Sequence, residues 1–143
     1  MTDRVAVALL CPLLTFACAV AAPSADLEKR IVAVAEAVTP SVVHIQAILK
    51  FDDRRNEVTG SGLIVTADGA ILTNEHVVDD AEKITVSVPG RKRKYSARLI
   101  GTDRQTDIAL LRIDPDADHP LTAARLSSDP VHVGQWVLAI GNP

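Results

Sequence analysis

Short apolar runs rich in β-branched residues alternate with turn residues along most of the chain. Polar and apolar positions alternate at 83–88, which is typical of a half-buried strand. Two of the intervening turns carry Asp68-Gly69 and Pro89-Gly90. Runs of this kind predict strands at 42–49, 58–66, 70–72, 83–88, 95–100, 108–113 and 136–140. About six or seven short strands at this spacing predict a mainly β protein built on a small antiparallel β-barrel.

A helical period precedes the first of these strands. The apolar positions there recur at spacings of four, three and four residues and are Leu27, Ile31, Val34 and Val38. Ser24 can cap the start of the helix. Pro40 ends it, because the residue before a proline avoids helical backbone angles. Residues 23–40 are therefore predicted to form a short amphipathic helix that lies against the body of the domain.

The first 22 residues have the layout of a secretory signal peptide. Arg4 lies in a short charged region, residues 5–20 are apolar, and Ala19-Val20-Ala21 offers a small-x-small cleavage site. The apolar stretch is short for a membrane span, which needs about 20 residues. We therefore expect cleavage, no stable membrane span afterwards and an extracytoplasmic location. Two alternatives stay open: the segment remains as an uncleaved anchor, or Cys18 is lipidated.

Charge and cysteine usage narrow the possible functions. The net charge of −3 gives no electrostatic footprint for nucleic acid. The basic run 91–94 follows a turn, which favours a solvated hairpin tip over a patch for a partner. Both cysteines, Cys11 and Cys18, lie in the first twenty residues, so the rest of the chain has no disulfide and no cysteine metal site. No histidine pairs with a second ligand at metal-binding spacing, and we expect no metal and no cofactor.

One histidine differs from the others in its context. His76 follows a predicted strand and a polar turn, and Asp107 begins a later apolar strand. A barrel can bring the two together, and an aspartate bonded to Nδ1 of a histidine leaves Nε2 free to accept a proton. Spacing alone leaves two interpretations open: a base with its orienting carboxylate, or a loop histidine and a polar residue at a strand start.

Four motifs in order carry a resemblance to a known family. They are GSGLIV at 60–65 with DG at 68–69, ILTNEHVV at 71–78, TDIALL at 106–111 and VGQWVLAIGNP at 133–143. Together they resemble the HtrA/Deg family of trypsin-like serine proteases, over about residues 30–143. The resemblance implies a chymotrypsin-like fold of two barrels, of which residues 41–143 supply the first. It places the family's general-base histidine on His76 and its triad aspartate on Asp107.

The same resemblance implies an envelope or periplasmic protease of protein quality control. Its substrates would be unfolded or misfolded proteins, and the complete protein would be a homo-oligomer, a trimer in this family, often with PDZ domains. The family's nucleophile motif, Gly-Asn-Ser-Gly-Gly-Pro, does not occur in these 143 residues. Ser61 has glycine neighbours but precedes a strand, where the family has a structural segment.

We therefore expect the 143 residues alone not to hydrolyse peptides. Two other hypotheses remain beside the N-terminal part of a serine endopeptidase. The chain could be a non-catalytic secreted β-barrel that binds a partner, or it could be a protease remnant without function.

Overall fold

The computed structural model describes residues 25–51 and 54–142. The elements run, in chain order, α1 Ala25–Val38, a 3-10 turn Thr39–Ser41, β1 Val42–Phe51, β2 Arg54–Ile64, β3 Ala70–Thr73, α2 Glu75–Val78, β4 Ala81–Ser87, β5 Lys94–Asp103 and β6 Ile108–Ile113. The predicted signal peptide at 1–22 lies outside the described residues, as does Ser24. Within the described part of the chain, no helix combines the length and apolar character needed to cross a membrane.

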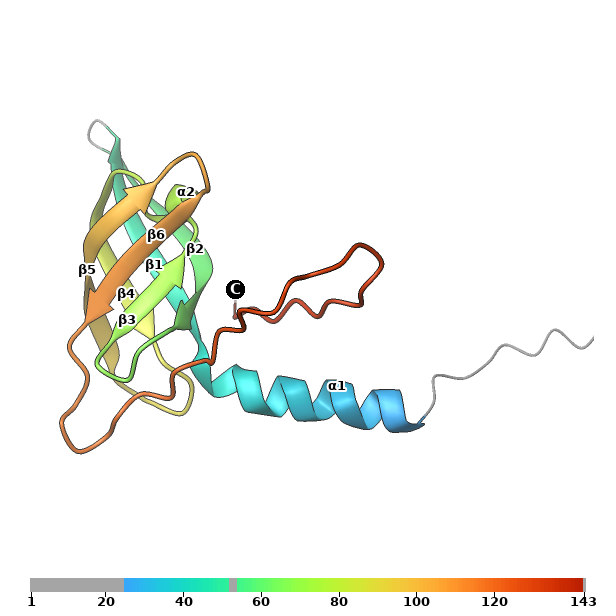
Figure 1. Ribbon diagram of the computed structural model, residues 1–143. Helices are drawn as coiled ribbons and strands as arrows, with labels where there is room; N and C mark the ends of the chain where they lie inside the picture. The colour runs from blue at the N-terminus through green and yellow to red at the C-terminus, as the bar shows by residue number, and fades with distance from the viewer. Residues whose placement is uncertain (1–24, 52–53, 143) are drawn as a thin grey trace, which may run out of the picture.

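The six strands close into one antiparallel barrel in the order β1-β2-β3-β6-β5-β4, with β4 returning to β1 (Figure 1). Every pairing between neighbouring strands is antiparallel. The mainly β fold class predicted from the apolar runs is confirmed. Closure matters for the site because it fixes β3 beside β6, with Thr73 opposite Ala109.

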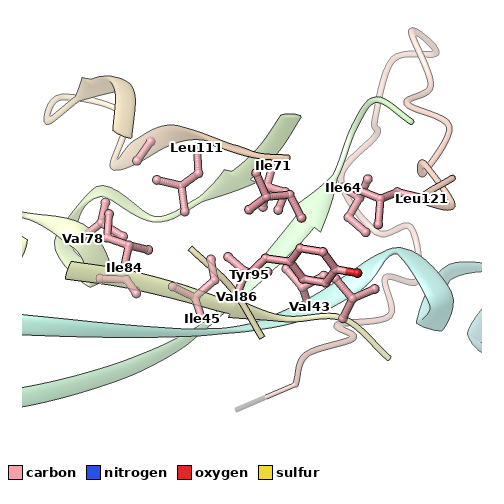
Figure 2. Close-up of a cluster of buried hydrophobic side chains, with 14 residues drawn as sticks. Val43, Ile45, Ile64, Ile71, Val78, Ile84, Val86, Tyr95, Leu111 and Leu121 are labelled. Carbon is pink, nitrogen blue, oxygen red and sulfur yellow. The ribbon is translucent and has the colours of Figure 1, made fainter. Parts of the chain in front are cut away.

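The barrel interior is filled by side chains from alternate positions of the strands. On β6, Ala109, Leu111 and Ile113 are buried, as the period of two along a strand requires. The core side chains converge inside the barrel (Figure 2) and include Val43, Ile45, Ile64, Ile71, Val78, Ile84, Val86, Tyr95, Leu111 and Leu121. Removal of this much apolar surface from water is the main force that holds the barrel together.

Helix α1 does not lie against the barrel, so that prediction is wrong. The helix projects away from the strands (Figure 1), and none of its residues is buried. The 3-10 turn Thr39–Ser41 joins it to β1 without a loop. A connection this short leaves the helix no length of chain with which to turn back onto the barrel.

The predicted strand at 136–140 is also absent. Residues 114–142 contain no regular strand, and Trp136 is 92% exposed. The physical reason is closure: β4 pairs with β1, so the barrel has no free edge to which another strand could add. The segment is attached at its start, where Leu121 enters the core and the Ala124 amide donates to the Ile64 carbonyl at 2.8 Å.

Candidate active site

Helix α2, Glu75–Val78, presents His76 at the rim of the barrel. It is a single turn, too short to be stable without tertiary contacts. Val77 and Val78 provide these contacts because both are buried, whereas His76 faces outward. Gly60 makes room for the turn: a Cβ there would lie 2.8 and 2.9 Å from the two methyl carbons of Val77. Gly60, the first residue of the 60–65 motif, therefore leaves the space that Val77 of this helix occupies.

Asp107 reaches α2 from the loop between β5 and β6. Thr73 at the end of β3 pairs with Ala109 near the start of β6, so the residues just beyond each strand end meet at the same rim. Asp107 has a φ of +56°, in the left-handed region that Asp and Asn enter more readily than most residues. In this conformation its carbonyl oxygen accepts the Glu75 amide at 3.2 Å, and its carboxylate faces His76.

The ring of His76 is bonded to the Asp107 carboxylate. The Nδ1 atom lies 2.9 Å from Oδ1 and 2.8 Å from Oδ2. Because an ionised carboxylate only accepts, Nδ1 carries the hydrogen and donates it. In the neutral ring Nε2 then keeps its lone pair. The His76 side chain is 68% exposed and that of Asp107 is 42% exposed, so Nε2 is accessible to a reacting group.

Two further donors converge on Asp107. Its Oδ1 accepts the His76 backbone amide at 3.0 Å, and its Oδ2 accepts Nδ2 of Asn74 at 3.1 Å. The backbone hydrogen bond from His76, followed by the bonds from its ring and from Asn74, holds the pKa of the Asp107 carboxyl below its ordinary range. The carboxylate therefore stays ionised and oriented toward the ring at neutral pH.

Ser61 has a different role in the structure. Its hydroxyl oxygen accepts the Asn142 amide at 2.8 Å, and its carbonyl accepts the Thr73 hydroxyl at 2.8 Å. His44 pairs with Ser61 across β1 and β2, and its Nδ1 lies 3.1 Å from the Asn142 carbonyl oxygen. A carbonyl only accepts, so Nδ1 of His44 is the donor. Ser61 and His44 thus fasten residue 142 to the barrel.

Sequence reasoning missed two residues that contact the pair or its helix. Asn74 adjoins α2, and its position in the motif directly before the helix could have indicated a contact. Arg104 lies in the same loop as Asp107 and contacts Glu75. Only the fold brings that arginine to the helix, so nothing in the local sequence pattern indicates it.

A groove of about 480 Å³ runs beside the pair. Its lining includes Leu72, Asn74, Asp107, Ile108 and Ile140. The lining combines apolar side chains with the polar residues Asn74 and Asp107. Among the described residues, no group of three or more histidine, cysteine, aspartate or glutamate side chains could hold a metal ion.

Comparison with known proteins gives a family. The family model described as "Trypsin-like peptidase domain" matches residues 60–143. A "Probable periplasmic serine endoprotease DegP-like" of Marinomonas sp. (strain MWYL1) is 51% identical over 84 residues, which are 59% of this chain and 17% of that protein. The corresponding protein of Pseudomonas savastanoi pv. phaseolicola is 49% identical over 90 residues, 63% of this chain and 18% of its own length.

A mammalian relative extends the match. "Serine protease HTRA4" of Mus musculus is 40% identical over 116 residues, 79% of this chain and 24% of that protein. The chain thus spans between 17% and 24% of the length of these three relatives. The family match covers more than half of the chain and agrees with the motifs read from the sequence. The chain therefore belongs to the trypsin-like peptidase domain family, in its HtrA/Deg group of serine proteases.

Proposed function

We propose that these residues form the base-bearing part of a serine endopeptidase. The observation that carries the proposal is the hydrogen bond of 2.8 Å between Nδ1 of His76 and the Asp107 carboxylate. This bond leaves Nε2 as the acceptor atom of an exposed ring. A histidine held in this tautomer is suited to remove a proton from a serine hydroxyl, since the proton acceptor and the oriented side chain are both in place.

Each group has a definite task in this chemistry. His76 Nε2 accepts the proton of the attacking serine and later donates it to the leaving amine. Asp107 keeps the ring in the productive tautomer and stabilises the imidazolium that forms. Asn74 donates to the same carboxylate at 3.1 Å and helps to keep it oriented toward the ring.

The nucleophile lies, in this proposal, in the part of the relatives that these residues do not span. The Gly-Asn-Ser-Gly-Gly-Pro motif does not occur in the 143 residues, and the Ser61 hydroxyl is bonded to Asn142. Loss of the nucleophile from a triad costs about a millionfold in rate. Backbone oxyanion donors would be missing as well. We therefore propose that the 143 residues alone do not hydrolyse peptides.

Location and substrate follow from the relatives by analogy. The two bacterial relatives carry the words "periplasmic serine endoprotease" in their names, which supports a periplasmic or envelope location here. The pattern of residues 1–22 agrees with secretion. We propose unfolded or misfolded proteins as the substrates of the complete protein and a homo-oligomer, a trimer, as its assembled state.

To test the proposal, the reading frame is sequenced and expressed through and beyond codon 143. The product is then assayed for hydrolysis of an unfolded protein substrate. Hydrolysis by this product, with none by the 143-residue chain, is the expected result. A product that carries a serine in the nucleophile motif and still cleaves no peptide under any condition tested would refute the proposal.

A second candidate function is favoured by one surface. Residues 131–138 expose several apolar side chains, among them Val131, Val133, Trp136 and Val137. An exposed apolar segment of this kind is typical of a binding surface. A non-catalytic secreted barrel would use it to hold a partner, and a reading frame that stops after codon 143 would favour this candidate over the peptidase.

A further inference from the structure

Arg104 connects the loop that carries Asp107 to the helix that carries His76. We propose that Arg104 is a positioning residue for the His76–Asp107 pair, acting through Glu75 and Asp79. This inference rests on the proposed peptidase function only for its kinetic consequence. Its structural content can be tested without any hydrolysis.

The guanidinium of Arg104 contacts both ends of α2. Its Nε donates to Oε1 of Glu75 at 3.1 Å, and its Nη2 donates to Oδ2 of Asp79 at 2.5 Å. Glu75 begins the helix and Asp79 caps its end, so one side chain spans the turn that presents His76. Two different nitrogens hold two different carboxylates, an arrangement that the planar fork of arginine permits and a single ammonium group reproduces poorly.

The loop between β5 and β6 therefore fixes α2 at two places. Arg104 opens the loop and binds Glu75 and Asp79, and Asp107 closes it and binds His76. A hydrogen bond within the loop also limits its movement, since the Asp103 carboxylate accepts the Gln105 amide at 3.0 Å. Two attachments three residues apart prevent the loop from pivoting about the Asp107 contact alone. The distance between the carboxylate and the ring is set by both.

Burial of Glu75 makes the arginine necessary. The Glu75 side chain is only 10% exposed, and Arg104 is its one ion-pair partner among residues 25–51 and 54–142. A buried carboxylate without a partner is strongly unfavourable, so its side chain would turn toward water if Arg104 were lost. Because Glu75 is the first residue of a one-turn helix, that movement would displace its neighbour, His76.

Once Glu75 has turned toward water, the loss of Arg104 should affect the geometry of the pair more than the folding of the barrel. Its side chain is 76% exposed, and exposed ion pairs add little to stability. The two carboxylates, Glu75 first, raise the pKa of Arg104 above its ordinary range, so the residue is charged at any working pH. Deletion of the side chain should therefore leave the barrel folded and loosen the contact between ring and carboxylate.

A nuclear magnetic resonance experiment on the 143-residue chain tests this directly. The readout is the exchange rate with water of the His76 Nδ1 hydrogen, which the Asp107 carboxylate protects. We expect Arg104→Gln to speed this exchange by about 10-fold to 100-fold and Arg104→Lys to give an intermediate rate. The matched control is Arg98→Gln, since Arg98 pairs with Asp114 at 3.2 Å and is 67% exposed but lies away from α2. The control should exchange at the wild-type rate.

Two outcomes would overturn the inference. One is wild-type exchange in a folded Arg104→Gln chain. The other is equal acceleration in the Arg98→Gln control. If Arg104→Gln fails to fold, Arg104→Lys and Asp79→Asn decide the matter. The first replaces the two-nitrogen fork by a single ammonium group, the second removes the charge of one partner, and both keep a cation beside Glu75. Wild-type exchange in both of these variants would likewise reject the proposal.

Kinetics of the complete gene product separate this inference from the proposed function. Arg104→Gln should lower kcat about 10-fold to 100-fold and leave KM unchanged, because neither Arg104 nor Glu75 lines the groove beside the pair. A complete product without peptidase activity would defeat the proposed function. The exchange measurement would still decide whether Arg104 positions the pair.

Discussion

Asp107 is bonded twice to the same residue, once to the backbone amide of His76 at 3.0 Å and once to its ring Nδ1 at 2.8 Å. The first bond fixes the helix turn relative to the loop, and the second fixes the ring relative to the helix. Asp107 makes both bonds from a left-handed φ of +56°, a conformation that is uncommon for residues other than glycine. Strain of this kind is retained where the surroundings depend on it, which agrees with a functional role for the residue.

Replacement of Asp107 by asparagine tests the orienting role. Asparagine tolerates the left-handed conformation, so Asp107→Asn should fold. Its amide group would donate toward the ring and favour the tautomer with the hydrogen on Nε2, which cannot accept a proton. We expect kcat of the complete gene product to fall about 10⁴-fold at neutral pH. Asp114→Asn, at a surface ion pair with Arg98, is the matched control, and a loss below tenfold in Asp107→Asn would contradict the assigned role.

Acid should destabilise the barrel through Asp116. The Tyr95 hydroxyl donates to this carboxylate at 2.8 Å, and that bond, with Arg93 and Arg91, holds the pKa of Asp116 below its ordinary range. A depressed pKa in the folded state gives stability that is present above the unfolded value near 3.9 and is lost as pH falls through the folded value. We expect the urea midpoint to drop between about pH 5 and pH 2.

Asp116→Asn should lower the urea midpoint at pH 6 and make its pH dependence shallower. Tyr95→Phe should have the same effect in smaller degree, since the two arginines remain. A variant profile that runs parallel to the wild-type profile would show that Asp116 does not carry the acid sensitivity. Asp68, Asp103 and Asp107 also have lowered pKa values and supply the remaining dependence.

The turn before β3 should tolerate no side chain at Gly69. A Cβ there would lie 2.1 Å from the carbonyl oxygen of Ile113, and the backbone has a φ of +104°. Gly90 also has a positive φ, +73°, but has open space around it. We expect Gly69→Ala to cost about 2–5 kcal/mol from strain and overpacking together. Gly90→Ala should cost about 1–2 kcal/mol from backbone strain alone. Urea unfolding compares them, and equal losses would mean that the contact with Ile113 relaxes freely.

The hydroxyl of Ser61 should anchor residue 142 and take no part in catalysis. Ser61→Ala removes one hydrogen bond worth about 1 kcal/mol, so amide exchange at Asn142 should rise about fivefold. Ser127→Ala, which removes a bond confined to its own turn, should leave this exchange unchanged. In the complete gene product Ser61→Ala should keep its peptidase activity. Loss of all activity would identify Ser61 as a reacting group.

The strands and turns were predictable because each depends on residues close together in the chain. The alternation at 83–88 and the turns at Gly69 and Gly90 both reflect local backbone preference and burial. The strand predicted at 136–140 failed for a reason that no local pattern contains. Its apolar residues suit a sheet, but the barrel closes between β1 and β4 and leaves them no partner.

The site was predictable only in part, for a similar reason. Spacing left His76 and Asp107 open to two interpretations, and the family motifs favoured their pairing before the fold brought them to one rim. The contact of Arg104 with Glu75 joins the loop between β5 and β6 to helix α2, 29 residues earlier in the sequence. The basic run 91–94 is largely exposed, as predicted, but Arg91 and Arg93 also bond to the 116–120 segment, a contact that the local pattern does not contain.

The most direct test of the proposed function is labelling of the complete gene product with a fluorophosphonate, which reacts with an activated serine. The wild-type product and a His132→Ala control should both be labelled, because the hydrogen bonds of His132 within the described part of the chain use its backbone and not its ring. His76→Ala should not react, since loss of the base costs about a millionfold. Labelling of His76→Ala at the wild-type rate, or a wild-type product that does not react, would contradict the assignment of His76 as the catalytic base.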